Sequence, residues 1–220
     1  VYKRQEPLLH GLGSYFRTFA RIRNYPHLLR FLIAFLFYND GIQTVIAVSA
    51  IFASTELGLS QGSVLGCFLM IQFVAMPGAL LFARLASRFG AKQAIMTSLL
   101  LFIAVTIYAY KMDSAIEFWL LGFVVALILG GSQAISRSLF AAMVPTDRTA
   151  EFFGFYAVSG KFASIFGPLV FAIISDTTGS ARLSILALSL FFIVGLVLLG
   201  SVNIKKGREQ AIVALEKTSV

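Results

Sequence analysis

Charged residues, cysteine and histidine are all scarce in this chain, and each scarcity removes a class of protein. Only 13% of the 220 residues are charged, against roughly 25% in a typical soluble domain, which excludes an ordinary soluble fold. The single cysteine, Cys67, cannot form a disulfide within the chain and supplies no cysteine metal site. The two histidines, His10 and His27, both lie near the N-terminus, so no histidine cluster is available. We therefore expect no bound metal and no cofactor.

Apolar residues are abundant instead, and they come in long blocks. They make up 58% of the chain and lack the alternation of β-strands. A transmembrane helix needs roughly 20 apolar residues, and six blocks approach or exceed that length. The predicted fold is therefore all-α, a polytopic membrane protein with six transmembrane helices between residues 28 and 203. The expected spans are residues 28–53, 63–85, 94–110, 118–138, 152–175 and 183–202.

Three shorter segments lie outside the spans. Residues 1–5, Val-Tyr-Lys-Arg-Gln, resemble a translated adapter joined to a broken reading frame, so we interpret them as a scar and expect the natural chain to begin upstream. Residues 6–27 carry arginines among apolar residues, which predicts an amphipathic cytoplasmic segment on the membrane surface. Residues 204–220 form a basic cytoplasmic tail.

The net charge of +8 reflects membrane topology rather than nucleic-acid binding. Nearly all lysines and arginines lie at the two ends of the chain or in the even-numbered loops between spans. The loops on the opposite side hold only Lys111 and Arg182. Because basic loops stay in the cytoplasm, both termini are predicted to be cytoplasmic. The expected partner is a lipid bilayer, and no nucleic acid.

The chain contains an internal repeat. Residues 78–90 align without a gap on residues 167–179, and Gly41-Ile42-Gln43 resembles Gly131-Ser132-Gln133. Each copy comprises three spans, and an odd number of spans inverts the second copy. Inverted three-plus-three repeats nested in a six-span half are the architecture of major facilitator transporters. The repeat therefore predicts one half of such a twelve-helix protein.

Short motifs resemble the same superfamily. Residues 84–92, Arg-Leu-Ala-Ser-Arg-Phe-Gly-Ala-Lys, resemble the loop signature of the major facilitator superfamily, with Ser87 at the usually acidic position. Residues 38–44, 130–138 and 151–161 resemble the autophagy-related vacuolar effluxer branch and its bacterial relatives. The resemblance covers nearly the whole chain after the scar. It implies the C-terminal six-helix half of a transporter, a missing N-terminal half as partner, and the plasma (inner) membrane of a bacterium as the location. Because the fungal members are associated with vacuolar amino-acid efflux, it also implies a small polar solute.

Asp40 is the residue around which a site is expected. It lies near the middle of the first span, where a charge costs on the order of 2.5–3.5 kcal/mol. On a helix, Asp40, Gln43, Thr44 and Ala47 share one face, which predicts a polar wall of a cavity. Lys161 in the fifth span lies at the same depth, roughly 13–15 Å from the cytoplasmic end at 1.5 Å per residue. The two residues form either a structural ion pair or a switchable pair that opens when Asp40 takes up a proton or substrate arrives, so proton coupling stays open.

Other polar residues fall into two groups. Amide and hydroxyl side chains can line the cavity or instead tie helices together; these are Asn39, Gln43, Thr44, Gln72 and Gln133. Charged residues near the ends of spans can gate access, and Arg137 can also snorkel or pair with Glu151; these are Arg88, Arg137 and Glu151. Small residues and prolines can allow close helix contacts and bends; these are Pro77, Gly78, Gly130, Gly131, Gly160, Gly167 and Pro168.

The function favoured by these features is transport of a small polar solute, amino acids among them, by alternating access. Two alternatives remain open: a membrane receptor or scaffold that retains the fold without transporting, and a half-transporter that works as a homodimer. An intramembrane enzyme is not expected, because the spans contain no paired catalytic aspartates, histidine metal set or serine–histidine dyad.

Overall fold

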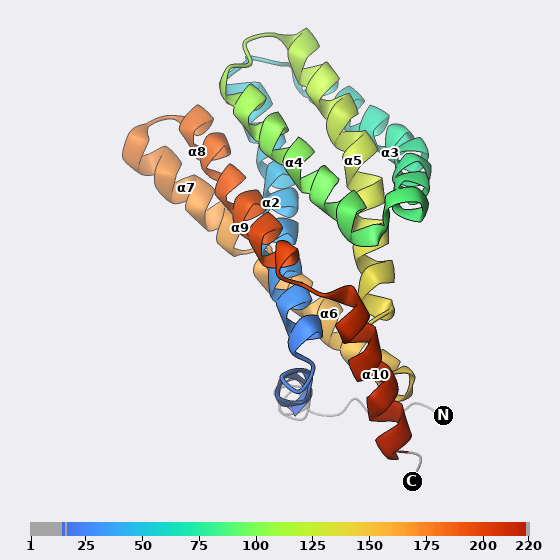
Figure 1. The fold of residues 1–220 in the computed structure, drawn as a ribbon. Helices are drawn as coiled ribbons and strands as arrows, with labels where there is room; N and C mark the ends of the chain where they lie inside the picture. The colour runs from blue at the N-terminus through green and yellow to red at the C-terminus, as the bar shows by residue number, and fades with distance from the viewer. Residues whose placement is uncertain (1–14, 16, 219–220) are drawn as a thin grey trace, which may run out of the picture.

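The computed structural model describes residues 15 and 17–218, and this part of the chain contains helices and no strand. Figure 1 shows a long bundle in which α2 begins, and α10 lies, at one end, and the α4–α5 connection lies at the other. We call these the α10 end and the Arg182 end. The proposed scar at residues 1–5 and residues 6–14 and 16 of the amphipathic segment lie outside the described residues. The helices are α2 (Pro26–Thr55), α3 (Gln61–Phe89), α4 (Ala91–Tyr110), α5 (Ala115–Ala141), η1 (Thr146–Arg148), α6 (Thr149–Ala163), α7 (Phe166–Thr178), α8 (Ala181–Ala187), α9 (Ser189–Gly200) and α10 (Ile204–Thr218).

Six helical segments among the described residues are long and apolar enough to cross a membrane. Four are the single helices α2 to α5, the fifth runs from Thr146 to Thr178 through α6 and α7, and the sixth runs from Ala181 to Gly200 through α8 and α9. The predicted all-α, six-span fold is confirmed. Most helices extend a few residues beyond the predicted spans, because their end turns are polar and hydropathy does not register them.

Helix α2 is the most buried span. Its most apolar stretch is 61% buried, against 17% for α3 and 18% for the fifth span. It packs along α9 and also contacts α5, α6 and α7. Tyr38 is fully enclosed on its α5 side, where its hydroxyl lies 2.6 Å from Ser136 Oγ. Because α2 is enclosed by so many neighbours, its mid-span polar residues Asn39, Asp40 and Thr44 are buried against other helices.

Helices α3 and α5 pack closely against each other because glycines line their contact. A Cβ on Gly78 would overlap the backbone of Leu127, and a Cβ on Gly130 would overlap the carbonyl oxygen of Ala75. Gly131 faces the ring of Phe82 in the same way. Small residues let two membrane helices approach to backbone contact, where dispersion forces are largest. This contact fixes the distance between two walls of the cavity described below.

The fifth span is broken next to Gly167 and Pro168, two residues that the sequence marked as able to allow close helix contacts or bends. Helix α6 ends at Ala163 and α7 begins at Phe166. Pro168 explains the break, since proline has no N–H for the carbonyl of Ser164 and its ring crowds that carbonyl. The N–H of Gly167, which a continuous helix would use internally, donates instead to Asp40 Oδ1 at 3.0 Å. A buried carboxylate therefore caps α7 inside the bundle.

The described part of the basic tail is helical. Helix α10 packs on α2 and η1 at the α10 end (Figure 1), with Gly207 against the Met143 side chain. Beside it, Lys92 Nζ donates to the carbonyl oxygens of Gly200 at 2.7 Å and Val202 at 2.8 Å. A lysine at this position satisfies carbonyls that the end of α9 leaves without donors.

Candidate functional site

A cavity of about 620 Å³ lies between α2, α3, α4 and α5, with Ile185 of α8 on its edge. Most of its lining is aliphatic or aromatic. Three glutamines interrupt this apolar lining, one from each of three helices: Gln43 of α2, Gln72 of α3 and Gln133 of α5. We call this space the glutamine cavity. The structure thus brings together three of the side chains that the sequence identified separately.

The glutamine amides are free to bind a ligand. Within the described part of the chain, none of the side chains of Gln43, Gln72 and Gln133 forms a hydrogen bond to protein, although Ser49 and Thr106 beside them bond to their own helix backbones. Each free amide offers two N–H donors and one carbonyl acceptor. Apolar pockets with a few convergent polar groups are typical of small-molecule sites, because the polar groups set orientation and the apolar walls exclude water.

Asp40 and Thr44 do not line this cavity, although the helical spacing placed them on the same face as Gln43. The Asp40 side chain is 2% exposed and points to α7, and Thr44 is fully buried with its hydroxyl donating to the carbonyl of Asp40 at 2.7 Å. Consecutive residues on a helix are about 100° apart, so Gln43 and Thr44 can face different neighbours. Because α2 has neighbouring helices on several sides, its polar residues are divided between them: Gln43 faces the glutamine cavity, whereas Asp40 faces α7.

Asp40 and Lys161 are not joined in this conformation. Lys161 is exposed near the end of α6, and the ion pairs among the described residues do not include either residue. The carboxylate binds the N–H of Gly167 instead. Any switching role of this pair stays a prediction.

Glu151 pairs with the N-terminal segment and not with Arg137. Its carboxylate accepts from Arg21 at 2.9 Å and from the Thr18 hydroxyl at 2.7 Å, while Arg137 is exposed on α5. Tyr15 also reaches α6, with its hydroxyl 2.9 Å from Ser159 Oγ. The predicted amphipathic segment is therefore fastened to the start of α6. The sequence signal for this contact was the combination of Glu151 at the start of the fifth span with several arginines in the N-terminal segment.

Other predicted site residues also lie outside the glutamine cavity. Asn39 donates to the carbonyl oxygen of Gly160 at 3.4 Å, which links α2 to α6. Gly160 itself has room for a methyl group, because the nearest atom would lie 3.4 Å away. Arg88 is exposed at the end of α3, with its guanidinium 5.5 Å from the centre of the Phe89 ring. Pro77 is exposed inside α3 without interrupting that helix.

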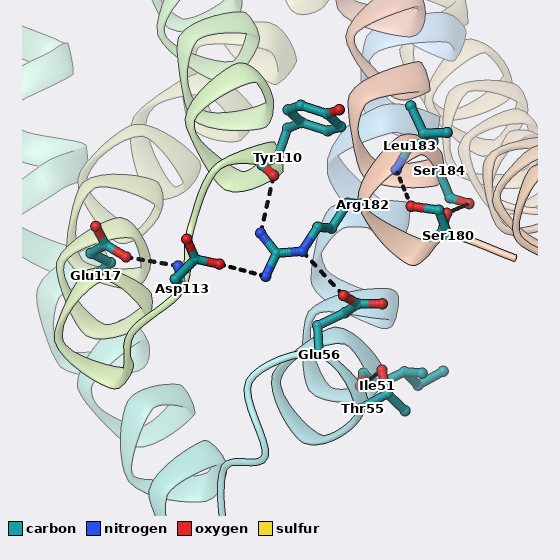
Figure 2. A network of polar contacts seen from close by, with 10 residues as sticks. All are labelled: Ile51, Thr55, Glu56, Tyr110, Asp113, Glu117, Ser180, Arg182, Leu183 and Ser184. Carbon is teal, nitrogen blue, oxygen red and sulfur yellow. Dashed lines mark hydrogen bonds and ion pairs between the residues drawn. The ribbon is translucent and has the colours of Figure 1, made fainter. Parts of the chain in front are cut away.

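Arg182 forms a network that the sequence analysis missed. Figure 2 shows its guanidinium between three connections at the Arg182 end: it donates to Glu56 at 3.1 Å, to Asp113 at 2.8 Å and to the carbonyl of Tyr110 at 3.2 Å. It thereby ties the start of α8 to the ends of α2 and α4. In the sequence, Arg182 is one of two bases in the loops opposite the termini, and the sequence gives no information on its partners.

No group of three or more histidine, cysteine, aspartate or glutamate residues in the described structure is placed to hold a metal ion. The glutamine cavity contains amides, hydroxyls and apolar groups, and the ion pairs described above lie outside it. Its chemistry is therefore hydrogen bonding and shape recognition.

The sequence pattern of the family described as "vacuole effluxer Atg22 like" matches residues 3–212. The chain belongs to this family. An uncharacterized MFS-type transporter, YxiO, of Bacillus subtilis is 38% identical over 203 residues, which are 91% of this chain and 47% of that protein. Autophagy-related protein 22-1 of Neosartorya fischeri is 33% identical over 221 residues, 93% of this chain and 36% of that protein. This Atg22-like chain therefore spans about half, or less, of the length of these relatives, and its resemblance to the effluxer branch and its bacterial relatives is confirmed.

Proposed function

We propose that this chain is one half of a membrane transporter that moves a small polar solute by alternating access, with the glutamine cavity as its half of the binding site. The observation that carries the proposal is the convergence of three unpartnered amides, from α2, α3 and α5, on one largely apolar space of about 620 Å³. Gln43 is half-buried, and Gln72 and Gln133 are exposed, so all three amides are accessible to a solute in the cavity. The names of the relatives, a transporter and the vacuole effluxer family, support the same class of function.

The solute class follows from the donors and acceptors of the cavity. Glutamine amides both donate and accept hydrogen bonds, so they can bind an amino acid by accepting from its ammonium and donating to its carboxylate. A volume of about 620 Å³ holds a solute of that size with its nearest waters. We therefore propose a small, polar, net-neutral solute, with amino acids among the first compounds to test. The description of the family as effluxers supports export as the direction.

The second half of the protein is proposed from exposed apolar surface. Helix α3 and the fifth span are the two least buried spans, and they expose large side chains such as Phe73 (80%) and Phe166 (63%). A second six-helix half would cover part of these surfaces and close the glutamine cavity, and relative motion of the halves would alternate access. The broken fifth span supplies a place for that motion. Pairing with a second copy of this chain would provide the same cover.

Transport by the complete protein, with its N-terminal half restored, tests the proposal. Proteoliposomes loaded with radiolabelled amino acids should release them. Gln43→Ala and Gln133→Ala should each raise KM by up to about tenfold, because a hydrogen bond contributes about 0.5–1.5 kcal/mol and about 1.4 kcal/mol corresponds to tenfold. Gln61→Ala is the matched control, because Gln61 is exposed at the start of α3 outside the cavity. Unchanged transport in both cavity variants would refute the assignment of the site. Absence of transport of any solute by a folded complete protein would favour the receptor or scaffold alternative.

A further inference from the structure

A second space of about 660 Å³ lies on the other side of α2. It shares no lining residue with the glutamine cavity and is bounded by α2, α6, α7, α9 and the helical residues that precede α2. Aromatic side chains dominate it. They are Tyr15, Phe19, Phe37, Phe155, Phe162, Phe166 and Phe191. We call it the aromatic groove.

Asp40 is the one charged residue among the described residues that line the aromatic groove. It is 98% buried, since only 2% of its surface is exposed. Its Oδ1 atom accepts the N–H of Gly167, and its Oδ2 atom has no hydrogen-bond donor within the described residues. Oδ2 is not fully enclosed by protein, so it can be reached from the groove. A carboxylate with so little contact with water and no counter-charge favours a cationic ligand.

We propose that the aromatic groove binds a hydrophobic organic ammonium ion, with the ammonium at Asp40 Oδ2 and the apolar body among the rings. A positive charge satisfies the carboxylate, and aromatic ring faces attract cations in addition. The same groove disfavours anions, and its described lining contains no base that could neutralise a ligand carboxylate. The ligand class is therefore a monocation without an acid group, which differs from the zwitterionic solutes proposed for the glutamine cavity.

The edge of the groove shows how such a ligand enters. Phe162 and Phe166 flank the break between α6 and α7, and they are 61% and 63% exposed. Their exposed rings extend the apolar lining outward, so an amphiphilic cation can enter along them from the apolar phase. Bound at Asp40, it would lie beside the N-terminus of α7, at the one interruption of the fifth span.

Equilibrium dialysis of the purified chain in nanodiscs, corrected with empty nanodiscs, tests the proposal with radiolabelled 2-phenylethylammonium. We expect saturable binding that 2-phenylethanol, the uncharged analogue, does not displace at equal concentration. L-phenylalanine should bind at least tenfold more weakly, because its carboxylate finds no partner. Comparable binding of the alcohol or of L-phenylalanine, or no saturable binding of the amine, would overturn the proposal.

Variants assign the binding to this groove. Asp40→Asn keeps an oxygen that can accept from Gly167 and should weaken binding of the amine at least tenfold, whereas Asp147→Asn, the same change at the exposed η1 turn, should not. If Asp40→Asn does not yield monodisperse protein, the two exposed rings at the edge of the groove provide the test. The double variant Phe162→Leu/Phe166→Leu should weaken binding about two- to fivefold per ring lost. Phe123→Leu, at an exposed ring outside both spaces, is its control. Full affinity in folded Asp40→Asn, or in the double leucine variant, would refute the site. Because the readout is binding rather than transport, the result is independent of the proposed transport function.

Discussion

The contact between α7 and α2 should be highly sensitive to a single added methyl group. A Cβ on Gly167 would overlap the Thr44 hydroxyl, and it would lie 2.9 Å from Thr44 Cβ and 3.0 Å from Asp40 Oδ1. Both neighbours belong to the buried helix α2, so neither can move away easily. Gly167→Ala must therefore push α7 away from α2.

Two losses contribute to the expected effect. Separation of the helices weakens the hydrogen bond from the Gly167 N–H to the Asp40 carboxylate, which as a bond to a charged group contributes about 1.5–3 kcal/mol. Overpacking of a tight contact costs about 1–3 kcal/mol more. We expect Gly167→Ala to lower the free energy of unfolding by about 3–5 kcal/mol. Removal of the overlapping hydroxyl by Thr44→Ala should restore part of that loss in the double variant.

Unfolding of the purified chain in mixed micelles with increasing SDS, followed by circular dichroism, measures these differences. Gly154→Ala is the matched control, because Gly154 lies in α6 with no atom within 4 Å of an added Cβ. It should be neutral or stabilising by about 0.5–1 kcal/mol, as for a helix glycine replaced by alanine. Equal stability of Gly167→Ala and Gly154→Ala, or no recovery on adding Thr44→Ala, would contradict the close contact between α7 and α2.

Three further predictions follow from the other contacts. Because Asp40 is held by α7 and not by Lys161, the effects of Asp40→Asn and Lys161→Met on the yield of monodisperse protein should add; rescue in the double variant would instead show that the two residues pair. Arg182→Gln should destabilise the Arg182 end by about 1 kcal/mol, with a smaller difference from wild type at high salt, and an unchanged thermal midpoint would argue against the network with Glu56. In right-side-out vesicles, tags at residue 12 and at the C-terminus should be protected and a tag near Leu57 accessible to a protease, and the opposite pattern would refute the predicted topology.

The sequence by itself determined the class of fold, because hydropathy is a property of each segment alone. Six apolar blocks became six helical spans, and the repeat that includes Gly78 and Gly167 marked glycines that lie at helix contacts. The sequence also marked Pro168 as a residue that can bend the fifth span, but it did not show that the helix breaks there. A proline in a membrane helix can bend it or break it, and the outcome depends on whether a neighbour satisfies the released backbone groups. That neighbour, Asp40, lies more than a hundred residues away in the chain.

Only the tertiary structure decided which polar residues share a space. Helical periodicity fixes the direction of a side chain relative to its own axis, and it carries no information on which helix lies in that direction. The same face of α2 therefore sends Gln43 into a cavity with Gln72 and Gln133, and sends Asp40 into a separate aromatic groove. The partner of Asp40 was unpredictable for a related reason. It is a backbone N–H, which every residue but proline possesses, and it became available only where the break in the fifth span released it.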